Sequence, residues 1–162
     1  MAARPGIAQL LLAVVAGCAV KPSPAPEGQA GRMQPAAPPV ITCLLQAPPH
    51  VSLTEPVVPV TFMLHNAGIA EIRVLARHTP LEGILGDLFE VTLANQRLAY
   101  RGPMVKRGAP DASEFVTLAP GDHVRATVDL LEGYDLSSAG QYTVRFSGTG
   151  GYACNELRLT RD

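Results

Sequence analysis

Short stretches in which apolar and polar side chains alternate, separated by turn-forming residues, constrain the fold of this sequence most. The stretch Val58–Leu64 alternates in this way and ends at His65–Gly68, a typical turn sequence. A period of two places every second side chain on one face of a strand. Pro59 indicates that this strand has an unpaired side or a bulge. Because fifteen Pro and fifteen Gly also favour turns over long helices, the sequence predicts an all-β fold.

Repeated short strands with turns between them predict, more narrowly, an immunoglobulin-like Greek-key β-sandwich. Tyr142, which follows Gly140 at the start of a strand, is typical of a tyrosine corner, whose hydroxyl group bonds back to the preceding connection. The alternation also predicts that Arg73 and Arg77 face outward. The predicted strands are Val40–Gln46, Val58–Leu64, Ile72–Ala76, Leu88–Ala94, Arg97–Tyr100, Phe115–Leu118, Val124–Leu130, Gln141–Ser147 and Ala153–Thr160.

The first 39 residues differ in composition from the rest. Residues 1–17 combine a basic Arg4 with an apolar run that is too short to span a bilayer and is typical of a signal peptide. Residues 18–39 are rich in Pro, Ala, Gly and Ser and have few side chains that could be buried, so they predict a flexible tether. The sandwich domain is therefore predicted over residues 40–162.

Cys18 is the predicted lipidation site, because the tetrapeptide Val15-Ala16-Gly17-Cys18 matches the lipobox of bacterial lipoproteins. An ordinary signal peptide with a chance cysteine and a buried helix are the alternatives. Ala19, in place of Asp, resembles signals that are sorted to the outer membrane. The sequence thus predicts an outer-membrane lipoprotein of the cell envelope that faces the periplasm and contacts the membrane through its lipid alone.

Cys43 and Cys154 remain as a pair once Cys18 is lipidated. In an oxidising compartment an even pair of cysteines favours a disulfide, and these two lie on the first and last predicted strands. Two free buried thiols are the alternative. A metal or catalytic role is disfavoured, because neither cysteine has a His or a second Cys at ligand spacing.

Composition and motifs exclude several classes of function. The net charge of −1 gives no basic surface for nucleic acid or for an anionic membrane. The sequence contains no H-E-x-x-H zinc motif, no G-x-S-x-G and no phosphate-binding glycine loop. Asp111, Glu114 and Asp122 are better explained as solvated carboxylates beside turns than as a metal cluster. We therefore expect no enzymatic activity, no metal ion and no cofactor.

Several irregular segments resemble a known family. They are HTPLEG (residues 78–83), VKRGAP (105–110), LAPGD (118–122) and YDLS (134–137). Over roughly Val51 to Phe146 the chain is similar to the non-catalytic N-terminal domain of bacterial aspzincin (deuterolysin-like, peptidyl-Lys) metalloendopeptidases. In that family the domain behaves as a pro-region that precedes a zinc protease, and the protease signature is absent from this sequence. The resemblance implies a stand-alone pro-domain equivalent whose partner is a secreted or periplasmic zinc metalloendopeptidase.

Two loops are the candidate partner-binding segments: the first loop, Arg77–Asp87, and the second loop, Arg101–Asp111. Loops carry function more often than the strands that hold them. In the first loop, His78 either hydrogen-bonds the loop backbone or contacts a metal ion of the partner. Leu81, Ile84 and Leu85 are apolar, so some are expected to pack beneath the loop and others to form a binding patch.

The second loop carries Val105, Lys106 and Arg107, and its adjacent positive charges are expected at an exposed tip. A solvated basic loop without a partner is the alternative. The resemblance implies a sharper role, because peptidyl-Lys metalloendopeptidases hold a Lys side chain in an acidic pocket just beyond the scissile bond. A pro-region can occupy that cleft as a non-productive substrate. On that basis Lys106 fills the pocket, and the carbonyl group of Val105 lies near the zinc.

Three functions are compatible with these features. The first is a lipid-anchored, non-enzymatic module that binds and inhibits a cognate zinc metalloendopeptidase. The second is an envelope chaperone or assembly lipoprotein that uses the same surface without blocking an active site. The third, a purely structural or carbohydrate-binding sandwich, is weakened by the absence of Trp.

Overall fold

The computed structural model describes residues 40–162. The predicted signal peptide (1–17), the lipidation site Cys18 and the tether (18–39) lie outside these residues. Regular structure in the described part consists of strands and three-residue 3-10 helices, which confirms the predicted all-β class. Over residues 40–162, no helix is long and apolar enough to cross a membrane.

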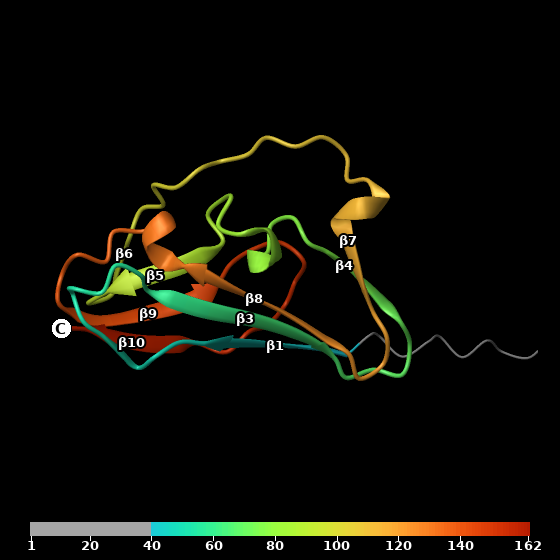
Figure 1. Cartoon of the computed structure of the whole chain (residues 1–162), viewed down its shortest axis with the longest axis horizontal. Coiled ribbons are helices and arrows are strands. Elements are labelled where there is room, and N and C mark those ends of the chain that lie inside the picture. The colour runs from blue at the N-terminus through green and yellow to red at the C-terminus, as the bar shows by residue number, and fades with distance from the viewer. Residues whose placement is uncertain (1–39) are drawn as a thin grey trace, which may run out of the picture. The chain divides into compact units, whose positions relative to one another are not determined.

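The strands form two larger sheets and one strand pair (Figure 1). One sheet has the order β1-β3-β8, the other β2-β10-β9-β5-β6, and the pair is β4-β7. Within residues 40–162, β2 and β10 pair in parallel, as does the isolated bridge between Cys43 and Cys154, while the other strand pairs are antiparallel. The elements are β1 (Ile41–Gln46), β2 (His50–Val51), β3 (Pro59–Asn66), β4 (Ile72–Leu75), η1 (Pro80–Glu82), β5 (Phe89–Leu93), β6 (Gln96–Arg97), η2 (Ala112–Glu114), β7 (Phe115–Leu118), β8 (His123–Asp129), η3 (Leu130–Glu132), β9 (Gly140–Phe146) and β10 (Leu157–Arg161).

The two larger sheets pack against each other through a continuous apolar core. Val60, Phe62 and Leu64, the alternating residues of β3, are fully buried. The ring of Phe62 lies 5.0 Å from that of Phe146 on β9, which joins the two sheets. Val91 and Val144 are buried in the same cluster. This arrangement is that of a β-sandwich, while the immunoglobulin-like Greek-key assignment stays a prediction.

Strand boundaries differ from prediction where other contacts replace sheet pairing. The last strand begins at Leu157 rather than Ala153, because Cys154 and its neighbour are attached to β1. In place of the predicted strand Arg97–Tyr100, the structure has the two-residue strand Gln96–Arg97, which shares only Arg97 with it. Pro59 is the first residue of β3 and pairs only with β8, since β1 ends opposite Thr61. The predicted unpaired side at Pro59 is therefore present.

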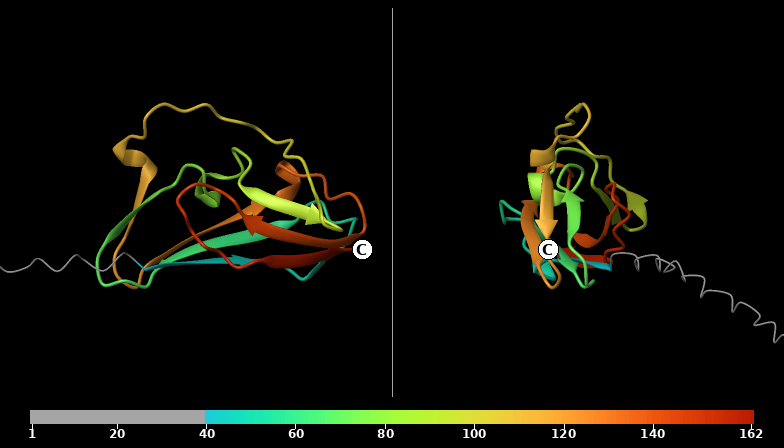
Figure 2. Two further views of the ribbon diagram at one scale, coloured as in Figure 1. Left: turned by 180° about the vertical axis from the view of Figure 1, so that it is seen from behind. Right: turned by 90° about the vertical axis from the view of Figure 1, so that its right-hand side faces the viewer.

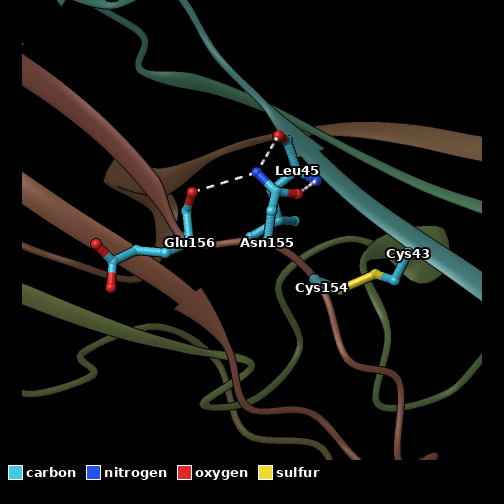
Figure 3. The surroundings of a disulfide bond; sticks show 5 residues. All are labelled: Cys43, Leu45, Cys154, Asn155 and Glu156. Atoms are coloured by element: carbon cyan, nitrogen blue, oxygen red, sulfur yellow. Dashed lines mark hydrogen bonds between the residues drawn. A yellow bond between two sulfur atoms is a disulfide. The ribbon is translucent and has the colours of Figure 1, made fainter.

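The disulfide between Cys43 and Cys154 is formed, as predicted, and it joins β1 to the segment before β10 (Figure 3). Asn155 extends this junction with its side-chain amide. Its oxygen accepts from the backbone N–H of Leu45 at 2.7 Å, and its nitrogen donates to the carbonyl group of Leu45 at 3.1 Å. These bonds satisfy backbone groups at the outer edge of β1, which would otherwise be open to pairing with another chain.

Two tyrosines fix the connections around the second sheet. The hydroxyl group of Tyr142 donates to the carbonyl group of Ser138 at 2.7 Å, which confirms the predicted tyrosine corner. The hydroxyl group of Tyr134 lies 2.8 Å from the Asp87 carboxylate and accepts from the backbone N–H of Phe89 at 3.0 Å. Burial raises the pKa of Tyr134, so this hydroxyl group keeps its proton. Tyr134 thereby fixes the end of the first loop against β5.

Figures 1 and 2 show how the second loop is placed. The pair β4-β7 stands at one end of the sandwich, and β6 lies near the other end. The second loop leaves β6, passes over the first loop and η1, and returns to η2 beside β7. The fold therefore places the two loops on the same side of the domain.

Candidate functional site: a surface formed by two loops

The first loop is fixed by a capped 3-10 turn. The hydroxyl group of Thr79 accepts from the backbone N–H of Leu81 at 3.2 Å and donates to the carbonyl group of Ala76 at 2.6 Å. Gly83 ends the turn at a φ of 88°, a value that glycine adopts without strain. His78 also has a positive φ, 61°, and its side chain is exposed. Within residues 40–162 the His78 side chain makes no hydrogen bond. The hydrogen bonds to the loop backbone that were expected of His78 are made by Thr79 instead.

The apolar residues of the first loop divide into two groups. Ile84 is 1% exposed and belongs to the core, so it supports the loop from below and is not a contact residue. Leu81 is partly buried against the same core. Leu85 is exposed and faces solvent. Of the three apolar candidates, Leu85 is thus the one available to a partner.

The second loop is attached to the domain at its start. The backbone N–H of Arg101 donates to the carbonyl group of Gly133 at 2.8 Å. The hydroxyl group of Tyr100 lies 2.6 Å from the carbonyl oxygen of Pro103 and 3.1 Å from that of Ile84. Burial, with the negative charge of Asp87, raises the pKa of Tyr100, so its hydroxyl group remains a donor. This tyrosine connects the bases of the two loops.

Arg77 holds the far end of the second loop. Its Nη1 donates to the carbonyl group of Gly108 at 2.7 Å, and its guanidinium group forms an ion pair with Glu114. The side chains of Arg77 and Glu114 are only 7% and 19% exposed. The prediction that Arg77 faces outward was wrong, because β4 ends at Leu75 and the strand alternation does not continue to residue 77.

Two contacts near the middle join the loops into one surface. The backbone N–H of Val105 donates to the carbonyl group of Leu85 at 3.4 Å, and the guanidinium group of Arg107 pairs with Glu82 at 2.8 Å. The hollow that remains between the loops is about 10 Å³, close to the space of one water molecule. The two loops therefore pack closely at this point and leave no room there for a partner's side chain.

The segment Met104–Lys106 lies in an exposed part of this surface. Met104 is 79% exposed, and Val105 and Lys106 are exposed as well. The expected exposure of Lys106 is thus found, and Arg107 is exposed as a residue although its side chain, which is paired with Glu82, is only 24% exposed. Lys106 forms no ion pair with any of residues 40–162. Met104 and Val105 thus present apolar side chains to solvent next to the unpaired positive charge of Lys106. We call Met104–Lys106 the exposed segment.

The surface carries exposed apolar and basic side chains. In the described part of the chain, no three side chains of His, Cys, Asp or Glu gather to hold a metal ion. The residues that shape the surface but were not among the candidates are Arg77, Glu82, Tyr100 and Glu114. Most of their partners lie far away in the sequence, such as 37 residues for Arg77 and Glu114, and no local pattern indicates these pairs. Tyr100 is the exception, since one of its partners, Pro103, is three residues away.

Comparison with known proteins adds a distant relationship. No protein-family model matches the chain. The chain is 30% identical over 87 residues to an extracellular protease of Aeromonas hydrophila. The match covers 54% of this chain but only 25% of that protein, so the chain spans about a quarter of its relative's length. This similarity is compatible with a protease-related domain, and the narrower assignment to the aspzincin pro-domain stays a prediction.

Proposed function

We propose that the domain binds a secreted or periplasmic zinc metalloendopeptidase through the two loops and inhibits it. The observation that carries this proposal is the exposed segment Met104–Lys106, which has no regular secondary structure and is held on both sides. Val105 is bonded to Leu85, and the following Arg107 is paired with Glu82. A segment ordered before binding loses little conformational entropy when a partner takes it up.

The proposed mode of inhibition is that of a substrate that is not cleaved. In this mode the exposed segment enters the cleft of the protease, and Lys106 places its ammonium group in an acidic pocket. The carbonyl group of Val105 then lies near the zinc of the protease. The role of Lys106 rests on the resemblance to lysine-directed enzymes, and its exposure and lack of an ion pair within the domain are compatible with it.

The remaining parts of the chain complete the proposal. Lipidation at Cys18 would anchor the protein in the outer membrane, where residues 18–39 would separate the domain from the lipid. The domain itself would have no catalytic activity and would need no cofactor. A protease exported through the envelope would then meet its inhibitor there. The distant similarity to an extracellular protease supports a protease-associated role.

Inhibition of a lysine-directed aspzincin endopeptidase by the purified protein tests the proposal. Lys106→Ala should weaken inhibition by about ten- to a hundredfold, because a charge-assisted contact contributes about 1.5–3 kcal/mol and 1.4 kcal/mol is a factor of ten. Lys106→Arg should weaken it less, since the charge is kept but the compact ammonium group is replaced by a planar fork. Neither change should lower the melting temperature noticeably, because the residue is exposed.

Arg125→Ala is the matched control, since it removes an exposed positive charge from β8. It should leave inhibition unchanged. Equal inhibition by Lys106→Ala and by the unaltered protein would exclude the substrate-like mode. Tight binding without any inhibition would instead favour the chaperone alternative.

A further inference from the structure

Arg161 is a buried cation without a carboxylate partner. The residue is 3% exposed on β10. Its Nε donates to the carbonyl group of Leu136 at 3.2 Å, its Nη2 makes a long 3.4 Å contact with the carbonyl group of Leu53, and its buried Nη1 has no hydrogen-bond partner. Within residues 40–162 no carboxylate forms an ion pair with it.

Arg77, the other arginine in the buried set, has the carboxylate partner that Arg161 lacks. Arg77 also lies away from solvent, but it pairs with Glu114. Burial of a charge is costly unless the charge is paired, and carbonyl groups alone compensate poorly. The charge of Arg161 has no counter-ion among residues 40–162.

Arg161 lines a hollow that is large enough to receive part of a ligand. The hollow has a volume of about 460 Å³, within the range of small-molecule and peptide sites. Leu53, Leu131 and Leu136 supply apolar lining. The carboxylates of Glu55 and Glu132 lie in the lining as well, together with Arg101, which is paired with Asp135 at 3.2 Å. The unpaired guanidinium group of Arg161 thus lies in a hollow lined by leucines and carboxylates.

We propose that this hollow binds the free C-terminal carboxylate of a peptide whose last side chain is apolar. The planar guanidinium group of Arg161 suits a carboxylate, which it can meet with two parallel hydrogen bonds. Phosphate is disfavoured, because it carries more negative charge and would meet Glu55 and Glu132 in the same lining. A ligand that binds through an Asp or Glu side chain is disfavoured, because the leucines of the lining would contact an apolar group next to the carboxylate.

Binding would change the contacts of the guanidinium group in a defined way. The long contact with the carbonyl group of Leu53 is the weakest of its hydrogen bonds. Release of that contact would free Nη2, which together with the unpartnered Nη1 could donate two hydrogen bonds to the incoming carboxylate. The bond from Nε to Leu136 keeps the side chain in place. This site rests on Arg161 and does not depend on the proposed protease inhibition.

An NMR titration of the full chain with N-acetyl-alanyl-leucine and with its C-terminal amide tests the site. The free acid should shift the backbone amide signals of Gly133 and Ser137, and the amide should bind at least tenfold more weakly. Inorganic phosphate should leave the same signals unchanged. Equal binding of acid and amide, absence of binding by the acid, or a response to phosphate alone would overturn the proposal.

Two substitutions complete the test. Leu53→Asp introduces a competing carboxylate at an exposed position of the lining and should weaken binding of the acid at least tenfold. Val57→Asp is the matched control, because Val57 is exposed but does not line the hollow, and it should bind normally. Arg161→Met should abolish binding, and if that variant does not fold, Leu53→Asp decides. Undiminished binding by Leu53→Asp would refute the proposal.

Discussion

Replacement of Arg77 by Met should destabilise the domain and loosen the second loop. The change removes the ion pair with Glu114 and the 2.7 Å bond to the carbonyl group of Gly108. Breaking a fully buried pair costs about 3–5 kcal/mol. Glu114 is 19% exposed and can regain some water, so the expected loss in the free energy of unfolding is about 2–3 kcal/mol. For a domain of this size the melting temperature should fall by about 8–12 °C.

The same substitution should also affect function through the loop. Without its far anchor, the second loop must be ordered when the partner binds, so inhibition should weaken by about three- to tenfold. Hydrogen exchange measures the loosening directly, because the backbone N–H of Val105 is bonded across the loops to Leu85. That amide should exchange faster in Arg77→Met than in the unaltered protein.

Arg97→Met is the control for this prediction, since Arg97 pairs with Asp87 in an exposed salt bridge. Such pairs contribute about 0–1 kcal/mol, so this variant should melt within about 4 °C of the unaltered protein. If both variants melt at the same temperature, the buried pair does not hold the loop as argued.

Two further predictions concern the covalent features of the chain. Replacement of both Cys43 and Cys154 by Ser should lower the free energy of unfolding by about 4–5 kcal/mol in the chain-entropy model, because the disulfide spans 111 residues of sequence; equal denaturant midpoints for the two proteins would contradict this. Cys18→Ser should move the protein from the membrane fraction to the soluble fraction, because the lipid is the expected anchor, and recovery of the variant in detergent-dependent membranes would exclude the lipobox interpretation.

The parts of the fold found from the sequence are those whose side chains follow a local period. Val60, Phe62 and Leu64 were expected on one face of a strand and are buried there. Most contacts without a local period were not predicted; the disulfide between Cys43 and Cys154 and the Tyr142 hydrogen bond are exceptions, because their residue types indicated them. The pairing of β2 with β10 involves two residues on each strand, and the side-chain amide of Asn155 replaces strand pairing at β1. Such contacts depend on which distant segments the fold brings together.

The same distinction explains the outcome for the candidate site. Both loops were identified from their composition, but the sequence does not show that Glu82 pairs with Arg107, because their association depends on the path of the second loop. Apolar character alone also could not separate Leu85, which is exposed, from Ile84, which is buried. Burial is decided by the turn at Pro80–Glu82 and by the core beneath it.

The two adjacent cations of the second loop have different physical roles. The planar guanidinium group of Arg107 forms an ion pair with Glu82 within the domain, and this pair holds the second loop against the first. Lys106 precedes it, points to solvent and pairs with no carboxylate of residues 40–162. A partner with an acidic pocket would therefore meet one accessible charge on a backbone that is already ordered. Because the fold already orders this backbone, binding would cost less backbone entropy, and the remaining cost would be the ordering and desolvation of the Lys106 side chain.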